Sequence, residues 1–171
     1  VSITVFAFTK LGLIQTHSVL AIYPIIILIL SRVFLNESIT WVYYIAILFG
    51  ILGVLLILTP DKTIFSYYLG FPICSATVIA LYGILTKYVS NHDSAEISLF
   101  WTAISGAIFI TGVGLLSWKP IGMVDLPFII VLCLISVFGH YCFIKAIDLK
   151  KISVLQPLAY LQFFFASIIG I

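Results

Sequence analysis

Charged residues are scarce in this sequence of 171 residues, where Asp, Glu, Lys and Arg make up 8% of the chain and hydrophobic residues 63%. Soluble globular domains carry about 25% charged residues, so the composition excludes an ordinary soluble domain and indicates a membrane protein. The net charge of only +2 and the scattered lysines favour no nucleic-acid partner.

Clustered metal ligands and paired acids are missing as well. The cysteines Cys74, Cys133 and Cys142 form no CxxC pair and lie in apolar stretches, where we interpret them as small packing side chains. His140 has no second ligand at a metal-site spacing, and no carboxylate lies in the middle of an apolar stretch. We therefore expect no metal site, no cofactor and no enzymatic activity.

Apolar stretches dominate what is present, and each is close to the roughly 20 residues that a helix needs to cross a membrane. One of them contains Arg32 in its last turn, where the long side chain can reach the headgroups. The sequence predicts an all-α membrane protein, a polytopic helical bundle of six full spans plus a partial one at Val1–Thr9. The six stretches are Ser18–Leu35, Ser38–Pro60, Thr63–Thr86, Ile97–Trp118, Leu126–Ile144 and Ile152–Ile171.

Short polar segments separate these stretches. Lys10–His17 is predicted as a connection, and Asn36-Glu37-Ser38 as a tight turn between antiparallel helices. Asp93 or Ser94 is expected to be the N-cap of the following helix, because short polar side chains at this position accept a hydrogen bond from a free backbone N–H.

A weak internal repeat relates the two ends of the chain. The later copy follows five membrane crossings after the earlier one, and because five is odd the two copies would run in opposite directions. Such inverted repeats occur in many secondary transporters. The matching residues, at an offset of 135, are Phe8 with Phe143, Lys10 with Lys145, and Ser18-Val19-Leu20 with Ser153-Val154-Leu155.

Lysine and arginine are unevenly distributed over alternate connections, which is the usual guide to membrane orientation. The excess is concentrated in the connection Lys145–Lys151, which we predict to be cytoplasmic. One side collects Arg32, Lys87, Lys145, Lys150 and Lys151, and the other collects Lys10, Lys62 and Lys119.

Two segments resemble the drug/metabolite transporter superfamily, the group with EamA-type domains. The first is SVLAIYPIIILILSRVFLNESITWVYYIAILFGILGVLLILTP, with a proline at Pro24, an acidic turn at Asn36-Glu37 and glycines at Gly50 and Gly53. The second, GHYCFIKAIDLKKISVLQPLAYLQFFFASIIG, is similar to the matching part of the second repeat of that family.

The resemblance implies ten helices in two inverted five-helix repeats and a location in the cell (plasma or inner) membrane. Residues 1–60 would be the end of the first repeat (helices 3–5), and residues 61–171 a truncated second repeat (helices 6–9). The chain opens without Met, its only Met being Met123, and ends inside an apolar run, so we expect it to be a fragment. It also lacks the acidic turn expected after helix 9.

A polar stripe in the last apolar stretch supplies the main site candidates. Ser153, Gln156, Tyr160 and Phe163 follow one another at helical spacing and share one helix face. Because lipid offers no hydrogen bonds, the polar members should turn toward the bundle or a hydrated cavity. They are candidates for a substrate pathway; the alternative is that the glutamines Gln156 and Gln162 only bond to a neighbouring helix.

Two prolines remove backbone donors at similar depths of the repeated helices. Pro24 is expected to kink its helix, and Tyr23 beside it joins the pathway candidates. Pro157 is ambiguous between a kink and an ordinary proline near a helix start. Kinked helices at a repeat interface can expose carbonyls to substrate, but a kink that serves packing alone is equally compatible with the sequence.

Two ionisable residues, His140 and Glu37, each allow more than one role. His140 is a candidate for proton coupling, since imidazole titrates near physiological pH, or a neutral histidine bonded to a neighbour such as Ser136. Glu37 lies in a turn at the membrane interface, where capping or pairing between loops is favoured over ion coupling.

These features favour an integral membrane secondary transporter that moves a small organic metabolite, such as an amino acid, a nucleotide-like or a drug-like solute, by alternating access. The implied partners are a small-molecule substrate and the lipid bilayer; homo-oligomerisation is left open. The alternatives are a non-transporting membrane scaffold subunit, whose polar stripe would face lipid or a partner helix, and an intramembrane enzyme, which would need acids or metal ligands at membrane depth.

Overall fold

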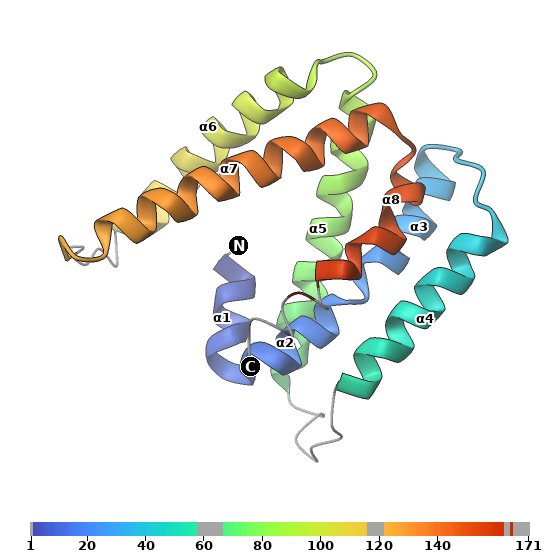
Figure 1. Cartoon of the computed structure of the whole chain (residues 1–171), viewed down its shortest axis with the longest axis horizontal. Coiled ribbons are helices and arrows are strands. Elements are labelled where there is room, and N and C mark those ends of the chain that lie inside the picture. Colours follow the sequence, from blue (N-terminus) through green and yellow to red (C-terminus); the bar gives the residue numbers. More distant parts are fainter. Residues whose placement is uncertain (1, 58–66, 116–121, 163–164, 166–171) are drawn as a thin grey trace. The chain divides into compact units, whose positions relative to one another are not determined.

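The computed structural model describes residues 2–57, 67–115, 122–162 and 165, and over these ranges the chain is helical, without strands (Figure 1). Two compact units are formed, one by Val1–Tyr88 with Lys150–Ile171 and the other by Val89–Leu149. The elements are α1 (Ser2–Leu11), α2 (Leu13–Leu20), α3 (Tyr23–Phe34), α4 (Trp41–Ile57), the 3-10 turn η1 (Tyr67–Leu69), α5 (Gly70–Val89), α6 (Ala95–Gly114), α7 (Leu126–Leu149) and α8 (Ile152–Ala159).

Four segments of the described chain are long and apolar enough to cross a membrane, namely Thr16–Phe34, Gly70–Val89, Ala95–Gly114 and Leu126–Leu149. Trp41–Gly53 is a shorter apolar helix. The all-helical, multi-spanning character predicted from composition is therefore supported. The other two predicted spans, Ser38–Pro60 and Ile152–Ile171, extend beyond the described residues, so the count of six spans and the inverted repeat stay predictions.

The predicted connection Lys10–His17 is wrong, because both of its ends are helical. Only Gly12 separates α1 from α2, and its φ of 79° lies in the left-handed region that glycine adopts without steric cost. The chain therefore turns at one residue instead of through a loop. Hydrophobic content alone did not show this, since Gln15, Thr16 and His17 interrupt the apolar pattern within α2.

The predicted helix Ser18–Leu35 is interrupted at Ala21–Ile22, where α2 ends and α3 begins. Pro24 is in the first turn of α3. Because proline has no N–H, it cannot donate to the carbonyl of Leu20, and its ring crowds that carbonyl. The last main-chain carbonyls of α2 therefore have no partner within their own helix, although they lie inside the candidate membrane span Thr16–Phe34.

Helix α8 packs against both α3 and α4, although the chain reaches α8 more than ninety residues after α4 ends (Figure 1). Its start contacts the turn after α3 and its end contacts the residues before α3, so α8 and α3 run antiparallel. Gly83 of α5 permits close packing here, because a Cβ at this position would lie 3.1 Å from Ile152 Cδ1. Ile27, Leu28 and Ile152 are each at most 1% exposed and form the core of this unit.

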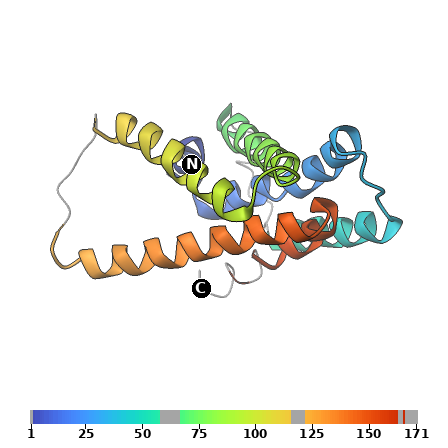
Figure 2. The ribbon, with the colours of Figure 1, turned by 90° about the horizontal axis from the view of Figure 1, so that it is seen from above.

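The second unit consists mainly of the helix pair α6 and α7. Ser94 is the N-cap of α6 and its Oγ accepts a hydrogen bond from the N–H of Ile97 at 3.4 Å, which confirms one of the two predicted cap residues. Both helices are apolar around most of their circumference, as expected of helices that face lipid. Figure 2 shows α6 diverging from α7 toward Gly114.

The two structural units do not coincide with the predicted repeats 1–60 and 61–171, because α8 packs with the N-terminal helices. A unit defined by packing and a repeat defined by sequence are different divisions, so the repeat boundary stays a prediction.

Candidate functional site

Glu37 caps the N-terminus of α8 from the opposite end of the sequence. Its Oε1 accepts a hydrogen bond from the N–H of Ile152 at 3.0 Å, and its Oε2 accepts one from the N–H of Ser153 at 3.1 Å. The side chain is only 7% exposed. A carboxylate at this position satisfies two N–H groups that have no partner within their helix and is stabilised by the helix dipole. The predicted capping role of Glu37 is confirmed.

The turn that carries Glu37 is itself well anchored. Asn36 adopts a φ of 51°, a left-handed conformation that asparagine tolerates. The N–H of Glu37 donates to the carbonyl of Ser31 at 3.2 Å, and Arg32 Nη1 donates to the carbonyl of Glu37 at 3.3 Å. Lys151 Nζ donates to Ser38 Oγ at 2.8 Å, so a second contact joins this turn to the start of α8.

Tyr160 makes the corresponding contact at the other end of α8. Its hydroxyl donates to the carbonyl of Ala21 at 3.1 Å, at the interruption between α2 and α3. Its ring lies against Gly50 of α4, where a Cβ would come within 2.6 Å of the ring carbons. One candidate residue therefore contacts both the interruption before Pro24 and Gly50 of α4.

Gln162 and Tyr23, two further candidates, contact each other beside Tyr160. Gln162 Nε2 donates to the Tyr23 hydroxyl at 3.2 Å. Gln162 is exposed and Tyr23 is half-buried. The structure therefore brings Tyr23, Tyr160 and Gln162 together around the start of α3.

Ser153 and Gln156 occupy the middle of the same inner face of α8 and are 0% and 2% exposed. Gln156 Nε2 donates to the carbonyl of Ile152 at 2.9 Å within the helix. The oxygen atoms Ser153 Oγ and Gln156 Oε1 are buried and have no hydrogen-bond partner among the residues that the structure describes. The alternative interpretation expected Gln156 to bond to a neighbouring helix, whereas its amide nitrogen bonds within α8.

Pro157 lies at the sixth position of α8, inside the helix and beyond its first turn. It cannot supply the N–H that would normally bind the carbonyl of Ser153. α8 ends at Ala159, and a turn at Tyr160 follows. Phe163, the last member of the predicted stripe, lies outside the described residues.

His140 belongs to the second unit. It is half-buried on α7, and its ring stacks on Phe143 with a centroid distance of 6.2 Å. Its proton-coupling role stays a prediction.

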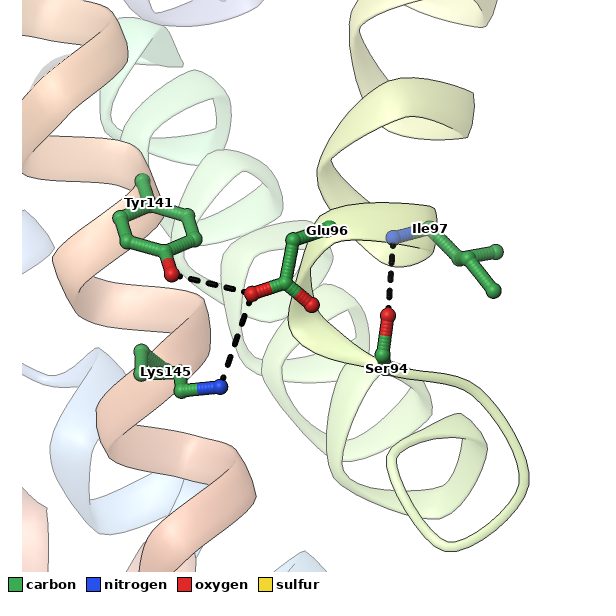
Figure 3. Close-up of polar contacts among 5 residues, drawn as sticks. All are labelled: Ser94, Glu96, Ile97, Tyr141 and Lys145. Atoms are coloured by element: carbon green, nitrogen blue, oxygen red, sulfur yellow. Dashed lines mark hydrogen bonds and ion pairs between the residues drawn. The ribbon is translucent and has the colours of Figure 1, made fainter.

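The second unit holds a polar cluster that the sequence did not single out, formed by Glu96, Tyr141 and Lys145 (Figure 3). Glu96 Oε1 accepts a hydrogen bond from the Tyr141 hydroxyl at 3.0 Å and lies 3.6 Å from Lys145 Nζ. The Glu96 and Lys145 side chains are 58% and 40% exposed, so the pair links α6 to α7 at a solvated position. The only local signal was Glu96 in the first turn of a helix; its partners lie more than forty residues away.

An apolar groove of about 500 Å³ also lies along α7, lined by Leu99, Ile129, Cys133, Val137 and Phe138 among others. Its walls offer almost no polar groups, so it suits apolar contacts rather than recognition of a polar solute. The polar candidates around α8 are the better site.

The chain is similar to several transporters, at low identity. It is 25% identical to a riboflavin transporter of Brucella anthropi over 165 residues, covering 92% of this chain and 57% of the relative. It is 26% identical to the S-adenosylmethionine uptake transporters of Rickettsia prowazekii and Rickettsia conorii, covering 85% and 81% of this chain and 49% and 47% of those proteins.

The chain thus spans about half the length of the curated relatives it matches. No family model and no solved structure matches it. Its distant relatives are transporters of small metabolites, which agrees with the candidate membrane spans of the structure.

Proposed function

We propose that this chain is part of a secondary transporter of the drug/metabolite transporter type, with EamA-type repeats, that moves a small organic metabolite across the cell membrane by alternating access. The contact of the Tyr160 hydroxyl with the Ala21 carbonyl carries the proposal, because it joins a polar helix face to interrupted backbone within a candidate membrane span. Interrupted helices in contact with polar side chains are where transporters bind their substrates.

The predicted architecture is part of the proposal. Ten helices in two inverted repeats would place α8 opposite its counterpart around α2 and α3, and the antiparallel course of α3 and α8 supports such a relation. The predicted cytoplasmic location of Lys145–Lys151 would put the Glu37 contact at the cytoplasmic face and Tyr160 deeper in the membrane.

The substrate pathway would be formed by Gln156, Tyr160, Ser153 and Tyr23, with Gln162 beside them and the interruption at Pro24 opposite. Phe163, which lies outside the described residues, stays a predicted member of the pathway. Riboflavin and S-adenosylmethionine are the first solutes to test, because the relatives are transporters of these two compounds. Both are polar organic molecules that a site with hydroxyl and amide groups can bind.

The direct test is uptake of radiolabelled riboflavin and S-adenosylmethionine by the full-length protein in vesicles, with and without a proton gradient. We expect saturable uptake of one of them, reduced at least about tenfold in a Tyr160→Ala variant. Uptake that does not respond to the proton gradient would remove His140 as a coupling residue.

Cysteine accessibility separates the transporter from a scaffold subunit. In the transporter, a Tyr160→Cys variant should react with a water-soluble maleimide and be protected by the transported solute. A scaffold would leave this position unlabelled, and a metabolite panel with no transported member would support that alternative. Conversion of a solute into a product would instead favour an intramembrane enzyme.

A further inference from the structure

The first turns of α8 present hydrogen-bond acceptors that lack donors. Within the described part of the chain, Ser153 Oγ and Gln156 Oε1 are both buried without a partner, and Pro157 has no N–H to offer the Ser153 carbonyl. Since the Ile152 carbonyl can only accept, the Gln156 amide is oriented with its nitrogen toward that carbonyl and its oxygen away from it. Buried polar atoms are normally hydrogen-bonded, so a donor group on a bound molecule would satisfy the Gln156 amide oxygen, which can only accept, and could also bind the lone pairs of Ser153 Oγ.

The positive end of α8 is already occupied. Helix N-termini in transporters commonly bind the anionic group of a substrate. Here Glu37 occupies the N–H groups of Ile152 and Ser153 with its own carboxylate. A carboxylate or phosphate of a solute would therefore find its donors taken and a buried negative charge beside them.

The neighbouring cations are held away from these acceptors. Lys151 Nζ binds Ser38 Oγ, and Arg32 Nη1 binds the Glu37 carbonyl. Both residues are exposed. Among the described residues, the charged side chain that binds the first N–H groups of α8 is the carboxylate of Glu37.

We propose that Ser153 and Gln156 recognise a positively charged hydrogen-bond donor, such as a protonated amine, on the transported solute. This inference rests on the proposed transport function and adds the chemical class of the group that binds at α8. An anionic group and a quaternary ammonium group, which has no N–H, are both excluded as the preferred ligand.

Three thiol reagents of similar size test this directly in the full-length protein. A Ser153→Cys variant, with Cys74, Cys133, Cys142 and any cysteine elsewhere in the full-length protein replaced by alanine, is treated with aminoethyl, trimethylammonioethyl and sulfonatoethyl methanethiosulfonate. Each rate is divided by the rate of the same reagent with a free thiol. We expect the aminoethyl reagent to react about tenfold faster than the trimethylammonioethyl reagent, with the sulfonate slowest, as one charge-assisted hydrogen bond would give.

The role of Gln156 is tested in the same background. Gln156→Leu should reduce the advantage of the aminoethyl reagent about tenfold, whereas Gln156→Glu, which keeps an acceptor at the same size, should preserve or increase it. Thermal unfolding of each variant verifies that it is folded. The inference would be overturned by equal rates for the aminoethyl and trimethylammonioethyl reagents, or by a faster reaction of the sulfonatoethyl reagent. It would also be overturned if the ratio of the two cation rates did not change in the Gln156 variants, or if no reagent reacted.

The uptake assay keeps the two proposals distinguishable. Saturable uptake together with equal rates for the aminoethyl and trimethylammonioethyl reagents would reject the protonated amine as the bound group and leave the transporter proposal intact. Selective reaction with the amine, in a protein that transports no solute of the panel, would instead count against the transporter proposal.

Discussion

The two ends of α8 are held in different ways. At its start, a buried carboxylate from Glu37 accepts two main-chain N–H groups. At its end, the half-buried neutral hydroxyl of Tyr160 donates to one main-chain carbonyl, and the exposed Gln162 binds Tyr23. Hydrogen bonds to charged groups are about twice as strong as neutral ones, so the start is the fixed end and the Tyr160 end is the one able to move. A helix that lines a transport pathway needs one fixed end and one movable end if the pathway is to open on one side.

Removing the carboxylate should break this comparison most severely. Glu37→Ala leaves two buried N–H groups without acceptors, and we expect a loss of about 2–4 kcal/mol in the free energy of unfolding. Thermal or denaturant unfolding in detergent measures it. Glu96→Ala is the matched control, because that carboxylate is itself exposed and binds half-buried side chains on α7, so its removal should change stability far less. Equal losses in the two variants would show that Glu37 is not the stronger anchor.

A methyl group at Gly50 tests the packing at the movable end. In Gly50→Ala the Cβ would lie 2.6 Å from the Tyr160 ring, which must shift, at a cost of about 1–3 kcal/mol. We expect lower stability and a strong loss of uptake. Gly53→Ala is the control on the same helix, because nothing lies within 4 Å of a Cβ at that position. If both variants behaved alike, the Tyr160 ring would not be held against α4.

The hydroxyl of Tyr160 can be removed without the ring. Tyr160→Phe should cost about 1 kcal/mol of stability, because one neutral hydrogen bond is lost. If the same hydroxyl also contacts solute, uptake should fall by more than this loss of stability explains. Measured KM and unfolding midpoints give the two quantities, and an unchanged KM would restrict Tyr160 to a structural role.

The smallest effect is expected at Gln162. Gln162→Leu removes an exposed hydrogen bond to Tyr23, and stability should change by less than about 0.5 kcal/mol. Unfolding measurements alongside Tyr160→Phe establish the order of the two contacts. A larger loss for Gln162→Leu would reverse the proposed ranking at this end of α8.

Features that depend on local sequence were predicted well. The apolar stretch from Leu126, the N-cap at Ser94 and the start of α8 near Ile152 follow from composition and capping preferences, which act over a few residues. The inward orientation of Ser153 and Gln156 also followed, since helical spacing and the absence of water in lipid determine which face is buried.

Contacts between distant residues could not be predicted in this way. The partners of Glu37 lie 115 and 116 residues away, and the partner of Tyr160 lies 139 residues away. In each case one partner is a main-chain group, which leaves no signature in the side-chain pattern. The cluster of Glu96, Tyr141 and Lys145 was missed for a related reason, because its members look like ordinary interfacial residues until α6 and α7 are paired.

The position of α8 against both α3 and α4 also has a consequence for biosynthesis. Ribosomes add about 5–20 residues per second, so Glu37 waits roughly 6–23 seconds before Ile152, 115 residues later, has been made. During that interval α3 and α4 are in the membrane without the helix on which they both pack, and the carboxylate has no helix to cap. Helices α3 and α4 are therefore expected to depend on lipid, or on the insertion machinery, until α8 has been synthesised.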